Sequence, residues 1–317
     1  MEGTPTTVTR KPLLSYVLIT PAKDEAAFIE ETLKSVISQT VLPRKWVIVS
    51  DGSTDGTDDI VKRYAAQHEW IELLRMPEGR ERDFAGKVGA FNAGHARIEA
   101  LSYDVVGNLD ADISVDPDYF AFLLDKFMVM SDLGVAGTPF VEEGFKYNYN
   151  FVNIDHVSGA CQLFRLKCFQ DIGGYKPIKG GGIDFVAVTT ARMLGWRTRT
   201  FTEKTCLHHR LTGTGKDGLL RARFKVGQKD YFLGGHPVWE LFRAVYQMTL
   251  RPYLLGGVFI LAGYLWAWCN RYERQISPEL MRFRHQEQMQ QLRRLLRRRL
   301  RPLEGKMSAD SLPAVRR

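Results

Sequence analysis

The chain has 317 residues and a formal net charge of +8 at pH 7. Hydrophobic residues make up 44% of it and charged residues 25%, which excludes a largely disordered chain and allows one large domain with an appendage. Ten arginines and three glutamates between Arg271 and Arg301 give that segment a charge of +7 and leave the rest nearly neutral. This distribution argues against a general nucleic-acid-binding protein and for a local anionic partner, such as a phospholipid surface.

The cysteines follow no zinc-binding or redox spacing, so we expect buried, reduced thiols in a cytosolic protein. They are Cys161, Cys168, Cys206 and Cys269. The segment 1–16 lacks the apolar core of a signal peptide, so we expect the main domain to face the cytosol.

Strand and helix patterns alternate from residue 13 to residue 130. Continuous apolar runs such as LLSYVLIT at 13–20 are typical of strands buried on both faces of a parallel sheet. Repeated alternation implies right-handed crossovers and an α/β fold, with a mainly parallel sheet sandwiched by helices. The last of these helices is expected to have Asp116 as its N-cap. The predicted strands are 13–20, 45–50, 71–76 and 104–109, and the predicted helices are 28–39, 57–67, 87–100 and 117–130.

The pattern changes after Leu133. The predicted elements there are strands at 134–140 and 159–164, an aromatic, Asn-rich connection at 145–151, a glycine turn at 180–182, a helix at 184–194 and a basic helix at 277–301. We divide the chain into a main domain at 1–210, a basic lid or acceptor-side helical segment at 211–250, and an apolar helix with an Arg-rich amphipathic tail at 251–317.

Two acidic motifs come directly after predicted strands. SDGSTDGT at 50–57 follows the second strand, and NLDADI at 108–113 follows the fourth. Ligands of such sheets bind beyond the carboxyl ends of the strands. Asp110 and Asp112 lie one residue apart on a turn and could face one cation, since Mg²⁺ and Mn²⁺ prefer carboxylate and phosphate oxygens. The alternatives are a polar loop with helix-capping aspartates and a helix start capped by serine or threonine.

These motifs, together with TPAKDE at 20–25 and GKVGAFNAG at 86–94, resemble the family 2 glycosyltransferases of GT-A fold. The resemblance runs from about residue 13 to residue 209, and it is the set of motifs in this order that is specific. One departure is Asp24, where the family often has asparagine. The resemblance implies an inverting, metal-dependent, hexosyltransferase-type enzyme that uses a nucleotide-diphosphate sugar.

The resemblance also assigns roles to single residues. It makes Asp112 the principal ligand of Mn²⁺ or Mg²⁺ and places Asp110 against the diphosphate or ribose. Lys87 flanks the nucleotide, where its charge could meet phosphate. The residues matched to the base and ribose site are Thr20, Pro21 and Asp51.

The segment GGGIDFVAVTTARMLGW at 180–196 is similar to the family's Glu-Asp pair, which is followed by a helix. The match puts Asp184 on the catalytic base, and Ile183 stands where the family has glutamate. A carboxylate can serve as base if it reaches the acceptor hydroxyl. The alternative is that Asp184 is the N-cap of the helix.

His208 and His209 follow a predicted strand, and some GT-A enzymes use a late histidine as a third metal ligand. Neutral imidazole suits manganese, so His208 is our candidate ligand, with two structural histidines as the alternative. The basic stretch from Arg210 to Lys229 could cover the diphosphate as a lid or form a solvated helix. The Gln-x-x-Arg-Trp motif of processive synthases does not occur near here, so we expect transfer of a single sugar.

Residues Tyr253–Cys269 carry no charge over 17 residues. A helix of that length extends roughly 25 Å, which is shorter than the roughly 30 Å hydrocarbon core of a bilayer. We therefore expect an interfacial or re-entrant helix, with the Arg-rich tail on the same anionic leaflet. The alternative is a buried core helix with a dimerising basic helix.

We thus expect an enzyme at the cytoplasmic face of the membrane, peripheral or re-entrant, that acts in surface polysaccharide or glycolipid synthesis. Its partners would be the nucleotide-sugar donor, a saccharide or lipid-linked acceptor and an anionic membrane surface, and no nucleic acid. Two alternatives stay open. One is a nucleotidyltransferase acting on a sugar phosphate, and the other is a catalytically silent membrane adaptor.

Overall fold

The computed structural model describes residues 14–77, 84–142, 154–210 and 218–304. The chain divides into two compact units, Met1–Thr212 and Gly213–Arg317. The sequence predicted a boundary at residue 210, close to this division. The described helices of the second unit pack together as one body, whereas the sequence analysis separated 211–250 from 251–317.

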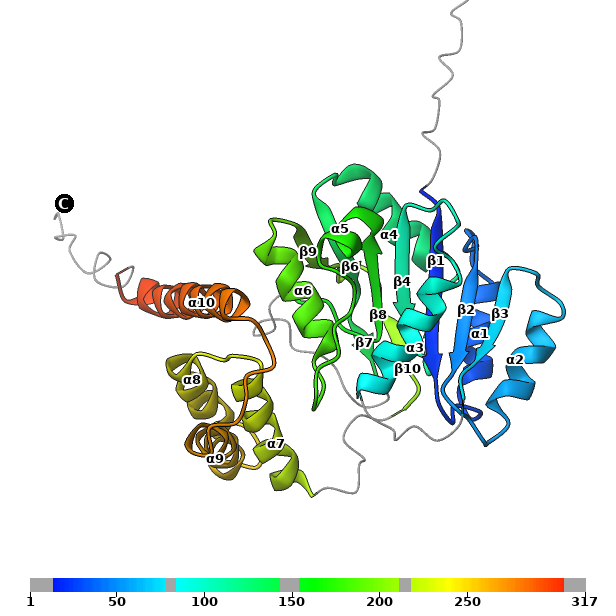
Figure 1. Ribbon diagram of the computed structural model, residues 1–317. Helices are drawn as coiled ribbons and strands as arrows, with labels where there is room; N and C mark the ends of the chain where they lie inside the picture. The colour runs from blue at the N-terminus through cyan, green and yellow to red at the C-terminus, as the bar shows by residue number, and fades with distance from the viewer. Residues whose placement is uncertain (1–13, 78–83, 143–153, 211–217, 305–317) are drawn as a thin grey trace, which may run out of the picture. The chain divides into compact units, whose positions relative to one another are not determined.

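A seven-stranded sheet forms the centre of the first unit, in the order β3-β2-β1-β4-β8-β6-β9 (Figure 1). Its parallel half consists of β1 (Tyr16–Ala22), β2 (Trp46–Ser50), β3 (Ile71–Arg75) and β4 (Val105–Leu109). Nearly every residue of β1, β2 and β4 is buried. Burial on both faces explains why these strands occur in the sequence as continuous apolar runs. The predicted α/β class and the four predicted strands are confirmed.

The other half of the sheet mixes strand directions. β8 (Cys161–Arg165) runs antiparallel to β4 and to β6 (Leu133–Gly137), and β9 (Arg197–Thr200) pairs parallel with β6 at the edge. The sequence of β9 is RTRT, and its arginines are exposed while its threonines are buried. Because no hydrophobic residue marks this alternation, the sequence analysis did not predict β9.

A smaller sheet joins segments that are far apart in the chain. Its order is β5-β10-β7, with β5 (Ile113–Val115), β7 (Phe140–Val141) and β10 (Cys206–His208). β10 is antiparallel to β5, and their register sets His208 opposite Ile113. Since Ile113 follows Asp112, this pairing brings His208 to the Asp-x-Asp turn.

Helices cover both faces of the large sheet (Figure 1). On one face α3 approaches closely, because a Cβ on Gly94 would lie only 2.7 Å from a methyl carbon of Ile19. α1 and α4 cover the opposite face. The described helices of the first unit are α1 (Ile29–Ile37), α2 (Thr57–Ala65), α3 (Phe84–Ala96), α4 (Tyr119–Val129), α5 (Leu166–Asp171) and α6 (Ile183–Met193).

The start of α4 differs from the prediction. Asp118 occupies the cap position, so the predicted cap at Asp116 is wrong. Asp116 takes part through its main chain instead. Its carbonyl oxygen accepts hydrogen bonds from the main-chain N–H of Tyr119 at 3.0 Å and from Nε2 of Gln39 at 2.7 Å. The predicted aromatic connection at 145–151 lies outside the described residues.

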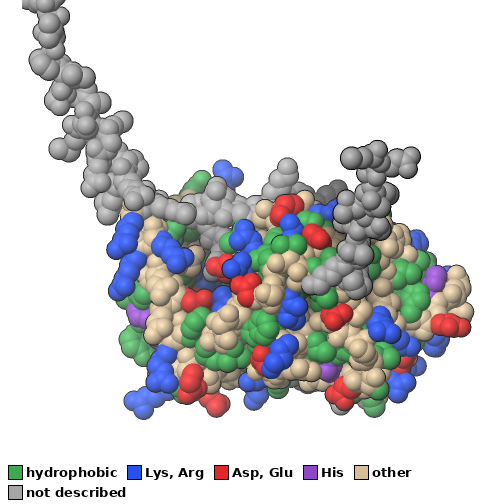
Figure 2. Space-filling view, turned by 90° about the horizontal axis from the view of Figure 1, so that it is seen from above, with side chains coloured by type: hydrophobic (Ala, Val, Ile, Leu, Met, Phe, Trp, Pro, Cys, Tyr) green, Lys and Arg blue, Asp and Glu red, His purple; other side chains and the backbone are tan. Residues whose placement is uncertain are grey.

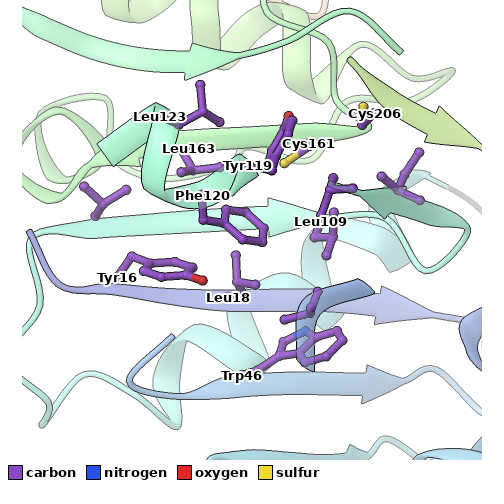
Figure 3. Close-up of a cluster of buried hydrophobic side chains, with 14 of the residues drawn as sticks. Tyr16, Leu18, Trp46, Leu109, Tyr119, Phe120, Leu123, Cys161, Leu163 and Cys206 are labelled. Carbon is purple, nitrogen blue, oxygen red and sulfur yellow. The ribbon is translucent and has the colours of Figure 1, made fainter. Parts of the chain in front are cut away.

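The core between the sheet and helices α1 and α4 is built from large side chains (Figure 3). Alternate residues of β1 point to it, so Tyr16 and Leu18 lie against Phe120, with the Tyr16 and Phe120 ring centroids 5.0 Å apart. Trp46 is fully buried, and its indole N–H donates to Oγ1 of Thr20 at 2.9 Å.

On the face shown in Figure 2, acidic and basic side chains lie among apolar and neutral ones.

The four cysteines are free. Cys161, Cys168 and Cys206 are buried, as predicted, and burial raises the pKa of the Cys206 thiol to about 12. Cys269 is exposed, so the prediction is wrong for that residue. It is the last residue of a helix that also exposes large apolar side chains, and the spacing of cysteines, on which the prediction rested, carries no information on which way a side chain faces.

The second unit contains four helices in its described part: α7 (Leu219–Phe232), α8 (Pro237–Met248), α9 (Leu255–Cys269) and α10 (Pro278–Glu304). α9 packs against α7 and α8. The first turns of α10 are fixed to the rest, because Oε1 of Gln288 accepts from the main-chain N–H of His236 at 2.8 Å. Within the described residues, every helix is too short or too polar to cross a bilayer.

A buried cluster of charged side chains holds α7, α8 and α10 together. Asp230 of α7 accepts from Arg284 of α10 at 2.7 Å and also pairs with Arg243 of α8. Glu240 of α8 is fully buried, and its carboxylate lies 3.7 Å from the Arg243 guanidinium. Burial, with the Asp230 carboxylate nearby, raises the pKa of Glu240 to about 9.

We expect Leu123→Ala in α4 to lower the free energy of unfolding by about 2–5 kcal/mol, because Leu123 is fully buried and its removal leaves a cavity. Val129→Ala is the matched control on the same helix, since Val129 is 76% exposed and should cost less than about 0.5 kcal/mol. Urea denaturation measures both. Equal losses for the two variants would contradict the assigned face of α4.

Glu240→Gln should gain stability relative to the wild type as pH rises. A carboxyl whose pKa rises from about 4.5 to about 9 on folding stabilises the fold fully below pH 4.5, and this contribution is lost as pH approaches 9. Glutamine stays neutral, so the Tm difference between variant and wild type should grow from pH 5 to pH 9. Glu69→Gln, at an exposed position, is the control. A difference that does not change with pH would mean that Glu240 is already ionised in the folded protein.

Candidate active site

A pocket of about 630 Å³ lies at the carboxyl ends of β1, β2 and β4. This is the edge of the sheet where the sequence predicted ligand binding. The predicted site residues that line it are Pro21, Asp51, Lys87, Asp110, Asp112 and His208. The sequence analysis gave no site role to Lys23 and Glu25, and it placed Arg210 only in a lid, yet all three also line the pocket.

Thr20 differs from the prediction. Its side chain is fully buried within β1, and its hydroxyl accepts a hydrogen bond from Trp46. The strand geometry explains this, because Thr20 and Pro21 point to opposite faces of the sheet. The structure therefore gives Thr20 a packing role and leaves Pro21 at the pocket.

Asp110 is the first residue after β4, and it forms a close ion pair with Lys87 of α3. Nζ of Lys87 donates to Oδ1 of Asp110 at 2.5 Å, and Nδ2 of Asn108 donates to the same oxygen at 3.3 Å. Burial lowers the pKa of Lys87, but the Asp110 carboxylate outweighs it, so that pKa is raised. Lys87 is therefore a fixed positive charge on the pocket wall.

Asp112 is held by two residues that follow each other closely in β10 and the loop after it. Nε of Arg210 donates to Oδ2 of Asp112 at 3.1 Å, and Nε2 of His208 lies 3.3 Å from the same oxygen. Burial alone would raise the pKa of Asp112, but the contacts with His208 and Arg210 lower it below its ordinary value. The hydrogen bond to Asp112 is the main reason why the pKa of His208 rises to about 9.

The second ring nitrogen of His208 is also engaged. Nδ1 lies 2.8 Å from Oε1 of Glu142, a buried residue next to β7. A carboxylate behind a histidine fixes the orientation of the ring and is the usual second contact of a metal-binding histidine. The oxygen of Asp112 and the imidazole of His208 are therefore two potential ligands for a divalent cation. No set of three histidine, cysteine or acidic side chains in the described part of the chain is arranged as a complete metal site.

Arg210 links two acidic residues of the pocket. Besides Asp112 it pairs with Glu25, and its guanidinium lies 5.2 Å from the centre of the Phe28 ring. The contact between Arg210 and Glu25 spans 185 residues of sequence. In the sequence, the one indication that Arg210 belongs to the pocket is its position two residues after His208.

Asp51 follows β2 and is nearly buried. Its Oδ1 atom has no hydrogen-bond partner among the described residues, and its Oδ2 atom lies 4.0 Å from Nζ of Lys23. A buried carboxylate oxygen without a partner is costly unless a ligand supplies a donor. Asp51 is thus suited to receive an N–H or O–H group of a molecule in the pocket.

Asp184 does not line the pocket but lies near it. α6 begins at Ile183, and Gly182 occupies the cap position, so the alternative of Asp184 as N-cap is wrong. A Cβ on Gly159 would lie 3.0 Å from Cβ of Asp184, while the Gly159 carbonyl accepts from Asn108 at 2.9 Å. One glycine therefore separates Asp184 from the strand that leads to Asp110. The charge of Asp184 also contributes to the raised pKa of Lys87.

Two solved structures share the architecture of this chain. A Pyrobaculum calidifontis mannosyltransferase in complex with GDP-Man and Mn²⁺ has a TM-score of 0.53 and 22% identity, covering 85% of this chain and 81% of that one. S. aureus TarS 1–349 in complex with UDP-GlcNAc has a TM-score of 0.52 and 14% identity, covering 86% and 78%. These likenesses confirm the predicted GT-A fold.

Curated relatives match part of the chain. The poly-beta-1,6-N-acetyl-D-glucosamine synthase of Staphylococcus epidermidis is 25% identical over 170 residues, which are 47% of this chain and 39% of the relative. The synthase of Staphylococcus aureus (strain COL) is 32% identical over 117 residues, 37% of this chain and 26% of the relative. The matched part is thus less than half of either relative.

The family model described as glycosyl transferase family 2 matches residues 17–175, which is half of the chain. The matched residues include both acidic motifs and Lys87, whereas Asp184 and His208 lie beyond them. The chain belongs to glycosyl transferase family 2.

Proposed function

We propose that this chain transfers one sugar from a nucleoside-diphosphate sugar to an acceptor hydroxyl, with inversion at the anomeric carbon. The observation that carries the proposal is the arrangement of charge in one pocket. One carboxylate oxygen of Asp51 is buried and has no hydrogen-bond partner in the described part of the chain. It lies in the same pocket as the Asp110–Lys87 pair and the Asp112–His208 pair. A base or ribose requires a hydrogen-bond acceptor such as the Asp51 oxygen. A diphosphate requires positive charge, which Lys87 and a bound cation would supply.

The donor's nucleoside is proposed to lie against Pro21 and to donate a hydrogen bond to Asp51. Its diphosphate would then lie among Lys87, Arg210 and the Asp-x-Asp turn. Both cations are engaged by carboxylates here, so their positions are set before the ligand arrives. Positive groups that are fixed in advance stabilise the charge of the departing nucleoside diphosphate with little reorganisation.

Asp112 and His208 are proposed to hold Mn²⁺ or Mg²⁺. Such an ion, when bound, offsets negative charge on the diphosphate. Glu142 would keep the His208 ring oriented for this role, because it contacts the nitrogen that faces away from Asp112. The pKa of His208, raised to about 9, means that the ring must release a proton before it can act as a ligand.

Asp184 is proposed as the general base that takes the proton of the acceptor hydroxyl. Its carboxylate is not used to cap α6, and it lies across Gly159 from the strand that leads to Asp110. The three glycines before it, Gly180, Gly181 and Gly182, all have positive φ angles that side chains rarely adopt. Substitution at these glycines would therefore displace the start of α6 and the base with it.

The relatives make UDP-N-acetylglucosamine the first donor to test, since they are named as N-acetylglucosamine polymer synthases and TarS was solved with UDP-GlcNAc. We propose a saccharide or lipid-linked acceptor in surface polysaccharide or glycolipid synthesis. The product should be one sugar longer than the acceptor, and a longer product would contradict transfer of a single sugar.

The purified chain should be stabilised against heat by one nucleoside diphosphate, and this should require Mn²⁺ or Mg²⁺. A ligand at about 100 times its Kd adds about 2.7 kcal/mol to the free energy of unfolding. Asp112→Ala should abolish the metal-dependent part. Asp59→Ala, an exposed aspartate in α2, is the matched control and should respond like the wild type.

If no nucleotide stabilises a well-folded sample, the proposed donor site is wrong and the adaptor alternative is favoured. Release of pyrophosphate from a nucleoside triphosphate would instead favour the nucleotidyltransferase alternative.

Asp184→Asn should lower kcat by about 10²–10⁴, because general base catalysis contributes about that factor. Nucleotide-dependent stabilisation should persist, since Asp184 lies outside the pocket lining. Release of nucleoside diphosphate from the donor measures turnover, and Asp171→Asn is the control on the neighbouring helix α5. Full turnover in Asp184→Asn would show that Asp184 is not the base. Loss of nucleotide binding would instead place Asp184 in the donor site.

A further inference from the structure

Helices α8 and α9 of the second unit expose many of their large apolar side chains. In a water-soluble bundle, large apolar side chains face inward and polar ones face outward. In α8 the buried positions are Glu240 and Ala244, while Val238, Leu241 and Val245 are 49–54% exposed. The spacing of these three residues places them on one face of the helix. This face is apolar and turned away from the other helices of the unit.

α9 exposes even more large apolar side chains than α8 does. Its contacts with α7 and α8 are made in large part by glycines. A Cβ on Gly263 would collide with the carbonyl of Phe224 in α7, and a Cβ on Gly257 with the carbonyl of Ala244 in α8. Ile260 and Tyr264 also face inward, but most of the large apolar side chains of α9 do not. Those that are 40–56% exposed are Leu255, Val258, Leu265, Trp266 and Trp268. Close packing through small residues, with large apolar side chains outside, is the pattern of helices that lie in lipid.

The charges around these helices fit one kind of partner. From Leu241 to Tyr272 the chain contains no acidic residue and no lysine. Arg251 and Arg271, both exposed, come before and after α9, and the exposed Arg293 and Arg294 lie on α10. Two copies of this chain would repel each other here, whereas anionic lipid headgroups would attract all of these side chains.

The length of α9 limits how deep it can lie. Its 15 residues extend about 22 Å, which is less than the roughly 30 Å hydrocarbon core. Arginine at both ends keeps both ends near headgroups, and Trp266 and Trp268 suit the boundary between headgroups and acyl chains.

We propose that the exposed apolar faces of α8 and α9 insert into one leaflet of an anionic bilayer, with the arginines of α10 and of the α9 ends on its headgroups. The buried cluster of Asp230, Glu240, Arg243 and Arg284 fixes α10 to α7 and α8, so the basic and apolar parts belong to one surface-binding unit. This proposal concerns the second unit and does not depend on the sugar transfer proposed above.

Flotation of the full chain with vesicles tests the proposal, using phosphatidylcholine with and without phosphatidylglycerol. The wild type should float with the anionic vesicles, and high salt should weaken binding. Trp266→Ser with Trp268→Ser, and separately Leu241→Ser with Val245→Ser, should weaken partitioning by about tenfold or more. Val129→Ser is the matched control, because Val129 is an exposed valine of the first unit and its loss should change nothing.

Tryptophan fluorescence distinguishes insertion from adsorption. Lipids brominated on their acyl chains should quench the wild type, and Trp266→Phe with Trp268→Phe should lose most of this quenching. Unchanged flotation of both serine variants, or no quenching of the wild type, would overturn insertion and leave adsorption by arginines alone. A chain that binds no vesicle but forms a dimer, which Leu241→Ser with Val245→Ser dissociates, would make a second copy the occupant of this face.

Discussion

The burial of two carboxylates on one short turn is the constraint on which the pocket depends. Asp110 and Asp112 enter the same space from the end of β4, and neither could stay ionised there without a nearby positive charge. Each has its own counterion: Lys87 from α3 holds Asp110, and Arg210, with His208, holds Asp112. These contacts tie α3 and the segment after β10 to the edge of the parallel sheet. The pocket therefore has its shape because its charges are balanced by parts of the chain that are far apart in sequence.

The same residues show what the sequence could and could not reveal. The strands β1, β2 and β4 were predictable because burial on both faces requires continuous apolar runs, and the acidic motifs at their ends followed from the sheet's polarity. The partners of those motifs were not predictable from local patterns. Glu142 and Glu25 meet His208 and Arg210 across 66 and 185 residues, through the pairing of β10 with β5 and β7. Only the folded register brings them together.

Thr20 and Asp184 illustrate a second limit. A motif match assigns a position along the chain, but the direction of a side chain depends on the element that carries it. Thr20 lies in a matched segment and yet points into the core, where it satisfies the indole of Trp46. Asp184 was ambiguous between base and cap until the structure placed Gly182 at the cap. In both cases the missing information was the phase of a strand or helix relative to its neighbours.

The direction in which neighbouring side chains point also decides what the glycines of a helix or strand indicate. In the first unit Gly94 and Gly107 allow close contacts with Ile19 and Leu18, but these large side chains are buried, as expected for a core in contact with water. In the second unit Gly257 and Gly263 allow equally close contacts, and there most of the large apolar side chains of the same helix are exposed. Glycine alone therefore does not indicate lipid. The proposed insertion rests on the combination, because in water such an arrangement leaves apolar surface exposed that repacking could bury, whereas in a leaflet that surface would lie in an apolar environment.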